Sequence, residues 1–272
     1  MYIDTHCHLT FPQYKEDQAM VIGNAKKAGV KKFINPGVDP ISCRLVVDLA
    51  KKHPGVIFAS VGFHPYEAQE IKDVSLLESL VKSSRPPSRD PNGFRVKPGM
   101  TTIVAIGECG LDYHQYKGHD ALGRKENQKQ LFKLQLKLAL EHNLPAIMHC
   151  RDAYEDFFGV LDNLPNTPRG VIHCFSGGLQ DLRDAQKHKF FVGIDGNVTY
   201  SKHLEMIVPH IPISMLLLET DAPFLTPVPH RGSRNEPKYI PLIAKKIAEL
   251  KKITPREVEE ATTKNAQELF GI

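Results

Sequence analysis

The sequence has little of what marks several classes of protein: an excess of charge of one sign, long apolar runs and an even set of cysteines. Its 35 Lys and Arg residues and 31 Asp and Glu residues leave a formal net charge of only +4. Domains that bind nucleic acid through a large basic face usually carry a stronger excess. The charge therefore neither requires nor excludes a substrate that bears phosphate.

No apolar run approaches the roughly 20 residues that cross a bilayer, so we expect no membrane segment. Residues Met1–His6 lack the basic start and apolar core of a signal peptide. The five cysteines are an odd number in a long chain, which suits a reducing compartment better than a disulfide framework. We therefore expect a cytoplasmic protein, and no obligate protein partner is evident.

What the chain does have is apolar content, at 41% hydrophobic residues, which excludes a disordered chain. Eight short apolar runs are separated by segments long enough for a helix. The predicted strands are Tyr2–Thr5, Lys32–Asn35, Val56–Val61, Ile103–Gly107, Ala146–His149, Gly170–His173, Phe190–Gly193 and Met215–Glu219. Apolar strands that alternate with helices indicate a parallel sheet covered on both sides. We therefore predict the α/β class and a single domain over residues 1–272, a (β/α)₈ TIM barrel of regular or distorted form.

An amphipathic helix is predicted over Lys125–Glu141, because an apolar stripe recurs there at helical spacing. The stripe consists of Leu131, Leu134, Leu138 and Ala139. A stripe of this kind indicates the buried face of a helix.

The last helix has a clear start and end. Thr254 can cap it, Pro255 suits its first turn and Glu257 completes a capping box. The helix is predicted to end near Gly271.

The segment Ser83–Gly99 is rich in proline and arginine and has no apolar period. Such a composition indicates an exposed loop. We interpret it as a tolerated surface insertion, with contact to a partner or an acidic ligand as the alternative.

Two histidines follow the first predicted strand. Alternate residues of a strand point the same way, so His6 and His8 project together. Two imidazoles side by side can bind one metal ion. The alternative is a pair of ordinary core or surface histidines.

Metal-ligating or charged groups also follow four other apolar strands. These groups are Glu108, His149, His173 and Asp221. A buried carboxylate or imidazole there is costly without a partner. In a barrel the carboxyl ends of all strands lie on one face, so the six side chains are expected to converge.

Six mixed nitrogen and oxygen ligands exceed what one zinc ion usually takes from protein. They suit two divalent ions that share a bridging carboxylate. Two such ions can activate a water and neutralise the charge that develops on a phosphoryl group. The alternative is that some of these residues are hydrogen-bonding groups of the core.

Four cysteines adjoin these ligands: Cys7, Cys109, Cys150 and Cys174. A neighbour on a strand points to the opposite face, so where the ligand faces the barrel mouth the cysteine faces the helical shell. We interpret these cysteines as small buried hydrophobes rather than ligands.

The motifs together resemble the TatD family of metal-dependent hydrolases, over nearly the whole chain. The matching stretches are Asp4-Thr5-His6-Cys7-His8-Leu9, Gly62-Phe63-His64-Pro65, Gly107-Glu108-Cys109-Gly110-Leu111-Asp112-Tyr113, His149-Cys150-Arg151-Asp152-Ala153, His173-Cys174-Phe175-Ser176-Gly177, Glu219-Thr220-Asp221-Ala222-Pro223-Phe224-Leu225 and Arg234-Asn235-Glu236-Pro237. The Pro-rich insertion and Cys109 depart from the commoner family pattern, but neither removes an expected ligand.

The resemblance implies a TIM-barrel hydrolase of the amidohydrolase superfamily that acts as a deoxyribonuclease, often from a 3′ end, with Mg²⁺, Mn²⁺ or Zn²⁺. It implies that His6, His8 and Asp221 bind one metal ion and that Glu108 bridges both ions. It further implies that His149 and His173 hold the second ion. Asp221 is also expected to take the proton from the attacking water, so Glu108 and Asp221 are the expected catalytic residues.

Other residues near these motifs are candidates for substrate contact. His64 could contact a phosphate or structure its loop beside Pro65. Arg151 could hold a phosphate oxygen or pair with Asp152. Glu219 is expected to orient a ligand from behind. A loop after the eighth strand adds candidates for contact with substrate or metal-bound water: Arg234, Asn235 and Glu236.

The leading hypothesis is a two-metal phosphodiesterase that acts on DNA without sequence specificity, because no recognition helix or zinc finger is present. The first alternative is hydrolysis of a small amide, ester or lactone, since the same scaffold supports that chemistry. The second is a non-catalytic scaffold, which predicts gaps in the ligand set, and the set has none.

Overall fold

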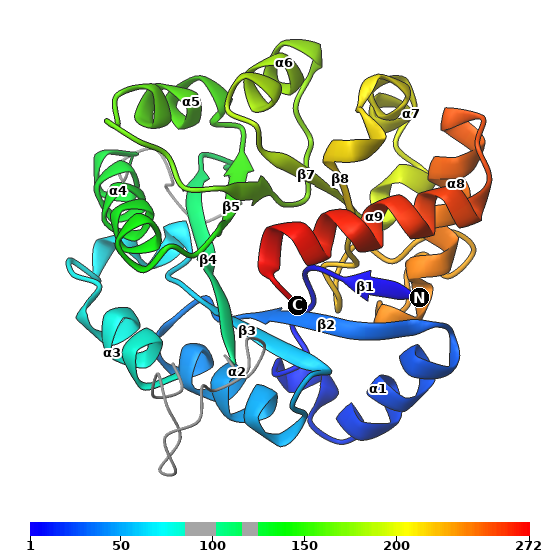
Figure 1. Ribbon diagram of the computed structural model, residues 1–272, viewed down its shortest axis with the longest axis horizontal. Coiled ribbons are helices and arrows are strands. Elements are labelled where there is room, and N and C mark those ends of the chain that lie inside the picture. The colour runs from blue at the N-terminus through cyan, green and yellow to red at the C-terminus, as the bar shows by residue number, and fades with distance from the viewer. Residues whose placement is uncertain (85–101, 116–124) are drawn as a thin grey trace, which may run out of the picture. The chain divides into compact units, whose positions relative to one another are not determined.

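The structure is a computed structural model that describes residues 1–84, 102–115 and 125–272 (Figure 1). Its eight strands follow one another in chain order. They are β1 (Tyr2–Asp4), β2 (Val30–Pro36), β3 (Ile57–Val61), β4 (Ile103–Asp112), β5 (Ala146–Arg151), β6 (Gly170–Ile172), β7 (Phe191–Ile194) and β8 (Leu216–Leu218). Parallel strands in this order, with helices between them, confirm the (β/α)₈ TIM-barrel class.

The helices fill the intervals between the strands. The α-helices of the described ranges are α1 (Gln18–Lys27), α2 (Pro40–Lys52), α3 (Ser75–Ser84), α4 (Lys125–His142), α5 (Tyr154–Asp162), α6 (Leu179–Lys187), α7 (Lys202–Ile207), α8 (Ile240–Lys251) and α9 (Pro255–Phe270). Short 3₁₀-helices are η1 (Pro12–Tyr14), η2 (Pro65–Gln69), η4 (Gly196–Thr199), η5 (Val208–His210), η6 (Ile213–Met215) and η7 (Pro237–Tyr239). In the described part of the chain, every helix falls short of the length and apolar character needed to span a membrane.

All eight predicted strands are present, and seven of them end within two residues of the prediction. The exception is β4, which continues beyond the predicted end at Gly107 to Asp112. Its pairing with β5 is irregular between Ile106 and Cys109, and Gly107 there has a φ of 145°, a conformation that favours glycine. The prediction stopped at this irregularity, whereas the strand continues and carries Glu108 within it.

The chain divides into two compact units, Met1–Asn35 with Val171–Leu269 and Pro36–Gly170 with Phe270–Ile272. In the first unit β1 pairs with β2, and β7 pairs with both β6 and β8. Strand side chains such as Phe33, Val192 and Leu217 are fully buried. Burial of a side chain of this size contributes roughly 1.5–3 kcal/mol, so these short strands are stabilised mainly by packing.

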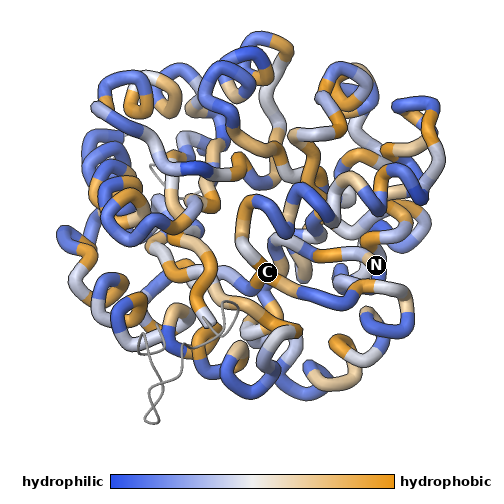
Figure 2. The backbone as a smooth tube through the Cα atoms, in the orientation of Figure 1, coloured by the Kyte–Doolittle hydropathy of each residue, from blue (hydrophilic) through white to orange (hydrophobic). Residues whose placement is uncertain are grey.

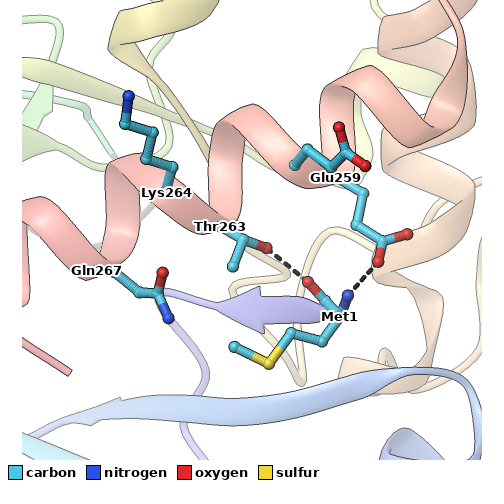
Figure 3. Close-up of a pocket in the computed structure, with 6 residues that line it drawn as sticks. Met1, Glu259, Thr263, Lys264 and Gln267 are labelled. Atoms are coloured by element: carbon cyan, nitrogen blue, oxygen red, sulfur yellow. Dashed lines mark hydrogen bonds and ion pairs between the residues drawn. The ribbon is translucent and has the colours of Figure 1, made fainter.

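Met1, which precedes β1, contacts α9 within the first unit (Figure 3). The Thr263 hydroxyl donates a hydrogen bond to the Met1 carbonyl, and the Met1 nitrogen pairs with Glu259. At the start of α9 the predicted capping box is confirmed: Thr254 N–H donates to Glu257 Oε2 at 2.7 Å, and Glu257 N–H donates to Thr254 Oγ1 at 3.2 Å. The pocket drawn in Figure 3 contains none of the predicted site residues.

In the second unit β4 pairs with β3 and with β5. Two buried glutamines of α4 hydrogen-bond to the main chain at the ends of β3 and β4. The Gln135 amide accepts from Phe63 N–H at 2.7 Å and donates to the Phe63 carbonyl at 2.9 Å. Gln128 makes the same pair of bonds with the main chain of Asp112, at 2.9 and 3.0 Å. Each glutamine therefore replaces a missing strand neighbour at a strand end.

The prediction for α4 was right in extent and wrong at one position. Leu131, Leu138 and Ala139 are buried, but Leu134 is 37% exposed. Figure 2 shows apolar and polar residues alternating along α4. Leu134 is outside because the neighbouring Gln135 takes the inward place, where its two hydrogen bonds satisfy its amide.

The predicted Pro-rich insertion over Ser83–Gly99 is corrected at its start. Ser83 and Ser84 are the last two residues of α3. The rest of that segment lies outside the described residues.

Candidate metal centre

The first unit brings His6, His8 and Asp221 together. The Nε2 atoms of the two histidines lie 3.2 Å apart. Asp221 Oδ1 lies 3.7 Å from Nε2 of His6 and 3.3 Å from Nε2 of His8. Both histidines are buried. Three donor atoms of the kinds that bind divalent metals thus face one another.

The main chain explains this convergence. Beyond β1 the chain runs beside the segment that follows β8, with Cys7 paired in parallel to Ala222. Asp221 N–H donates to the His6 carbonyl at 2.9 Å, and His8 N–H donates to the Ala222 carbonyl at 2.8 Å. The strand alternation that places His6 and His8 on one side therefore also aligns them with Asp221.

His173 joins this group from the end of β6. Its ring stacks on His6 with centroids 4.0 Å apart and planes 5° apart. His6, His173 and Asp221 each offer a ligand atom within 4.8 Å of the others. Glu219 Oε1 lies 3.8 Å from His173 Nδ1, and only a glycine at position 193 leaves room for it, because a Cβ there would lie 2.1 Å from Glu219 Oε2.

Buried acids surround this first group. Burial raises the pKa of Asp4 to about 7 and that of Asp195 to about 6. Burial and the charge of Asp195 also raise the pKa of Glu219. For Asp221, burial acts to raise the pKa, but the hydrogen bond and charge of His8 bring it below its usual value. Acids crowded in this way are costly unless a cation is near.

The second unit assembles another group around Glu108 and His149. Glu108 Oε1 lies 2.9 Å from His149 Nδ1 and 3.6 Å from His64 Nε2. The other ring nitrogen of His149 contacts Asp112 Oδ2 at 3.2 Å, and the Tyr66 hydroxyl donates to the same oxygen at 2.9 Å. His64, Asp112 and His149 each offer a ligand atom within 4.8 Å of the others.

The two acids control the charge of His149. Burial acts to lower the pKa of the imidazole, but hydrogen bonds to Asp112 and Glu108 raise it to about 9. The same contact, working against burial, lowers the pKa of Asp112. The two acids therefore favour a positive charge at this imidazole, which a bound metal ion would supply.

Two glycines of β4 permit the second group to form. A Cβ on Gly107 would lie 2.4 Å from the Ile147 carbonyl oxygen, and a Cβ on Gly110 would lie 1.9 Å from the His149 carbonyl oxygen. Gly110 also has a φ of 149°. Glycine at both positions lets β4 approach β5 and sets Glu108 beside His149.

The donor atoms fit divalent metal ions in chemistry and spacing. Ligand atoms about 2.1 Å from a tetrahedral zinc ion lie about 3.4 Å apart. The separations among His6, His8 and Asp221 span 3.2 to 3.7 Å. Imidazole and carboxylate donors accept Zn²⁺, Mn²⁺ or Mg²⁺. Each unit by itself therefore offers a group suited to a divalent cation.

The remaining predicted residues have distinct surroundings. Arg151 is exposed at the end of β5, while Asp152 contacts His114 Nδ1 at 2.7 Å. Asn235 is fully buried, and its amide donates to the carbonyls of Thr220 and Phe224 at 2.8 and 2.5 Å.

The neighbouring residues of the same loop form ion pairs. Glu236 pairs with Lys238 at 2.9 Å and with Arg234 at 3.3 Å. Arg234 also makes a two-pronged contact with Asp17, at 3.0 and 2.6 Å. These pairs and the buried amide of Asn235 shape the loop after β8.

Sequence reasoning missed three acids of these groups: Asp4, Asp112 and Asp195. Asp112 shares a strand face with Glu108 at an even spacing, a signal that the extended β4 makes visible. Asp195 follows the apolar strand β7, so the rule that found the other ligands could have found it too. Asp4 accepts from the Thr220 hydroxyl at 2.6 Å.

The cysteines match the prediction of small buried side chains in most cases. All five are free thiols, and four of them are buried. The Cys7 and Cys109 thiols donate to main-chain carbonyls at 3.7 Å. Cys174 differs, since it lies beyond β6 with a φ of 48° and is only partly buried, so strand alternation does not apply to it.

Comparison with known families gives one match over nearly the whole chain. The sequence model of the family described as TatD related DNase matches residues 3–271. Among curated proteins, the chain is 37% identical to "Uncharacterized metal-dependent hydrolase YabD" of Bacillus subtilis, with all of both chains covered. It is 33% identical to "3'-5' ssDNA/RNA exonuclease TatD" of Erwinia tasmaniensis, with 99% of each chain covered.

Solved structures of similar fold also come from TatD homologues. The chain is similar to YJJV, a TatD homologue from Escherichia coli, with a TM-score of 0.86 at 30% identity, over 100% of this chain and 98% of that one. A TatD-family hydrolase from Entamoeba histolytica shares the fold, with a TM-score of 0.81 at 23% identity over 99% and 97% of the two chains.

Proposed function

The chain belongs to the TatD related DNase family of metal-dependent hydrolases, and we propose that it is a deoxyribonuclease that cleaves phosphodiester bonds of DNA from the 3′ end. Support comes from relatives named 3′-5′ ssDNA/RNA exonuclease at 33% identity over 99% of the chain. The observation that carries the proposal is the presence of imidazole and carboxylate donors at metal-ligand spacing in both units.

The proposal extends to the chain as a whole. One family model spans residues 3–271, which supports a single hydrolase domain over 1–272. The odd number of cysteines, five in a long chain, supports a reducing compartment, and we propose the cytoplasm.

Two divalent cations, Mg²⁺, Mn²⁺ or Zn²⁺, are the proposed cofactors. Their proposed ligands are His6, His8, Glu108, His149, His173 and Asp221. Other acids orient these ligands: Glu219 contacts His173, and Asp112 contacts His149. A carboxylate behind a ligating imidazole fixes its ring and raises its basicity.

When bound, the cations would supply Lewis acidity toward a phosphoryl oxygen and a lower pKa for the attacking water. The pKa of Asp221 lies below its usual value beside His8, so Asp221 is suited to accept a proton from that water as a carboxylate. Its Oδ1 faces both imidazoles of the HxH pair, which fixes the orientation of the carboxylate. Glu108 is oriented by its 2.9 Å contact with His149.

Binding of DNA is proposed to be independent of sequence. Arg151 is exposed and is the proposed phosphate contact, with His64 beside Glu108 as a second one. Asn235 and Glu236 are proposed to affect substrate binding indirectly, because their contacts hold the loop after β8 in shape.

The test is hydrolysis of single-stranded DNA labelled at its 5′ end. The protein with Mg²⁺ or Mn²⁺ is expected to shorten the strand stepwise, and Asp221→Asn is expected to stop this. Asp152→Asn is the control, because its contact is with His114. If labelled DNA stays intact while a small amide, ester or lactone is cleaved, the deoxyribonuclease proposal is wrong and the alternative substrate class is right.

A further inference from the structure

Two aromatic side chains follow proposed metal ligands of the first unit at the same spacing. Phe11 comes three residues after His8, and Phe224 comes three residues after Asp221. Phe11 N–H donates to the His8 carbonyl at 3.1 Å, and Phe224 N–H donates to the Asp221 carbonyl at 2.9 Å. One tight turn thus ties each ring to a ligand.

The two rings form a continuous aromatic surface with the ligand. Phe11 stacks on His8, with centroids 4.4 Å apart and planes 22° apart. Phe224 meets Phe11 edge to face, with centroids 6.2 Å apart and planes 74° apart. His8 is buried, Phe11 is partly buried and Phe224 is 47% exposed. The surface therefore leads from the ligand outward to solvent.

The exposed ring sits on a rigid loop. Asn235, fully buried, donates through its amide to the carbonyls of Thr220 and Phe224. Asn235 N–H donates to the Pro223 carbonyl at 3.1 Å. The loop is thus fixed on both sides of Asp221, so Phe224 is held in place rather than exposed by a loose chain.

We propose that Phe224, supported by Phe11, is a stacking platform for one unpaired nucleobase of a single-stranded substrate. The inference rests on the proposed deoxyribonuclease function and adds the part of the substrate that this surface receives. Every base has an apolar π-face that stacks on an aromatic ring, so such contacts tolerate any sequence. Bases of a duplex are already stacked on their neighbours, so the platform selects unpaired strand ends.

The platform also explains how a protein of weak net charge can bind a DNA strand. A net charge of +4 gives little general attraction for a polyanion. A stacked base contributes affinity that does not depend on charge, next to the residues that are proposed to act on the phosphate. Substrate binding is therefore divided between cations that hold phosphate and a ring that holds the base.

The test compares hydrolysis of a normal oligonucleotide with that of strands that carry an abasic unit at one of the last two 3′ positions. For one of the two abasic positions, the wild-type protein is expected to show a kcat/KM at least about fivefold lower than for the normal oligonucleotide. Stacking of a base on an aromatic side chain has effects of this size or larger. In Phe224→Ala this ratio is expected to fall close to one. Phe224→Tyr keeps an aromatic ring and is expected to keep the ratio.

The control is Met206→Ala, which removes another exposed apolar side chain, on α7. It is expected to keep the wild-type ratio, and thermal melts of every variant verify folding. A Phe224→Ala protein that still discriminates as the wild type does would overturn the platform and leave the nuclease intact. A wild-type protein that cleaves none of the strands would refute the proposed function, and the platform with it.

A second measurement reports the contact itself. A strand with 2-aminopurine at the sensitive position, next to a phosphorothioate linkage that slows cleavage, is expected to lose fluorescence when the wild-type protein stacks the base. Phe224→Tyr is expected to quench, and Phe224→Ala is not. Equal quenching by Phe224→Ala would place the base elsewhere and overturn the platform.

Discussion

Gly110 lies directly against His149, so that a Cβ added at Gly110 would come within 1.9 Å of the His149 carbonyl oxygen. The two residues are partners in the pairing of β4 with β5. Gly110 bears no proposed ligand atom, but its lack of a side chain is what allows the proposed ligand His149 to lie where it does.

Replacement of Gly110 by alanine tests this relationship. Its φ of 149° and the close carbonyl both oppose a side chain, so Gly110→Ala is expected to lower the free energy of unfolding by about 3 kcal/mol and to abolish most activity. Gly159→Ala is the matched control, because Gly159 lies in α5 with open space around it, and it is expected to be neutral or stabilising. Urea unfolding measures the stability of both variants, and hydrolysis of labelled DNA measures their activity. A Gly110→Ala protein as stable and as active as the control would contradict the packing argument.

Removal of a proposed ligand carboxylate is expected to weaken metal binding and turnover together. Glu108→Gln and Asp221→Asn keep the shape and remove the charge, so we expect kcat/KM to drop by more than about 100-fold. Calorimetric titration with Mn²⁺ measures the accompanying loss of affinity. Glu205→Gln is a control that removes a carboxylate paired with Lys246 on α8, and it is expected to bind metal normally. Normal metal affinity in both ligand variants would remove them from the ligand set.

Chelation is expected to stop hydrolysis and to lower the melting temperature. The buried acids Asp4, Asp195 and Glu219 are costly without a nearby cation, and a ligand that binds only the folded state stabilises it. Differential scanning calorimetry before and after EDTA, followed by added Mn²⁺, measures loss and recovery. An unchanged melting temperature throughout would show that these acids are satisfied by the protein alone.

The contact between Asp17 and Arg234 predicts a pH-dependent contribution to stability. The hydrogen bond from Arg234 lowers the pKa of Asp17 in the folded protein. A carboxyl group with a lowered folded pKa stabilises the fold above its unfolded pKa, near 4, and loses that effect as the pH falls through the lower folded value. Asp17→Asn is therefore expected to melt below the wild type at pH 7, and by a smaller margin at about pH 3. An equal difference at both values would assign the effect to packing.

The strands were predictable because their apolar runs are short and sharply bounded, and the HxH pair because strand alternation forces His6 and His8 to one side. Asp112 was not predictable in the same way, since the apparent end of β4 at Gly107 is a local irregularity that the chain passes through. Leu134 was misplaced because polarity alone does not reveal that Gln135 can turn inward to bond the main chain of Phe63. Local pattern thus identifies elements and ligand types, whereas contacts made between elements decide which side chains support them.

The two glutamines of α4 attach their strand ends through amides, which stay uncharged over the whole pH range in which carboxylates and imidazoles titrate. Protonation of the second group of ligands therefore leaves these four amide hydrogen bonds in place. Brief exposure to moderately low pH is therefore expected to remove activity reversibly, and an assay after neutralisation measures the recovery.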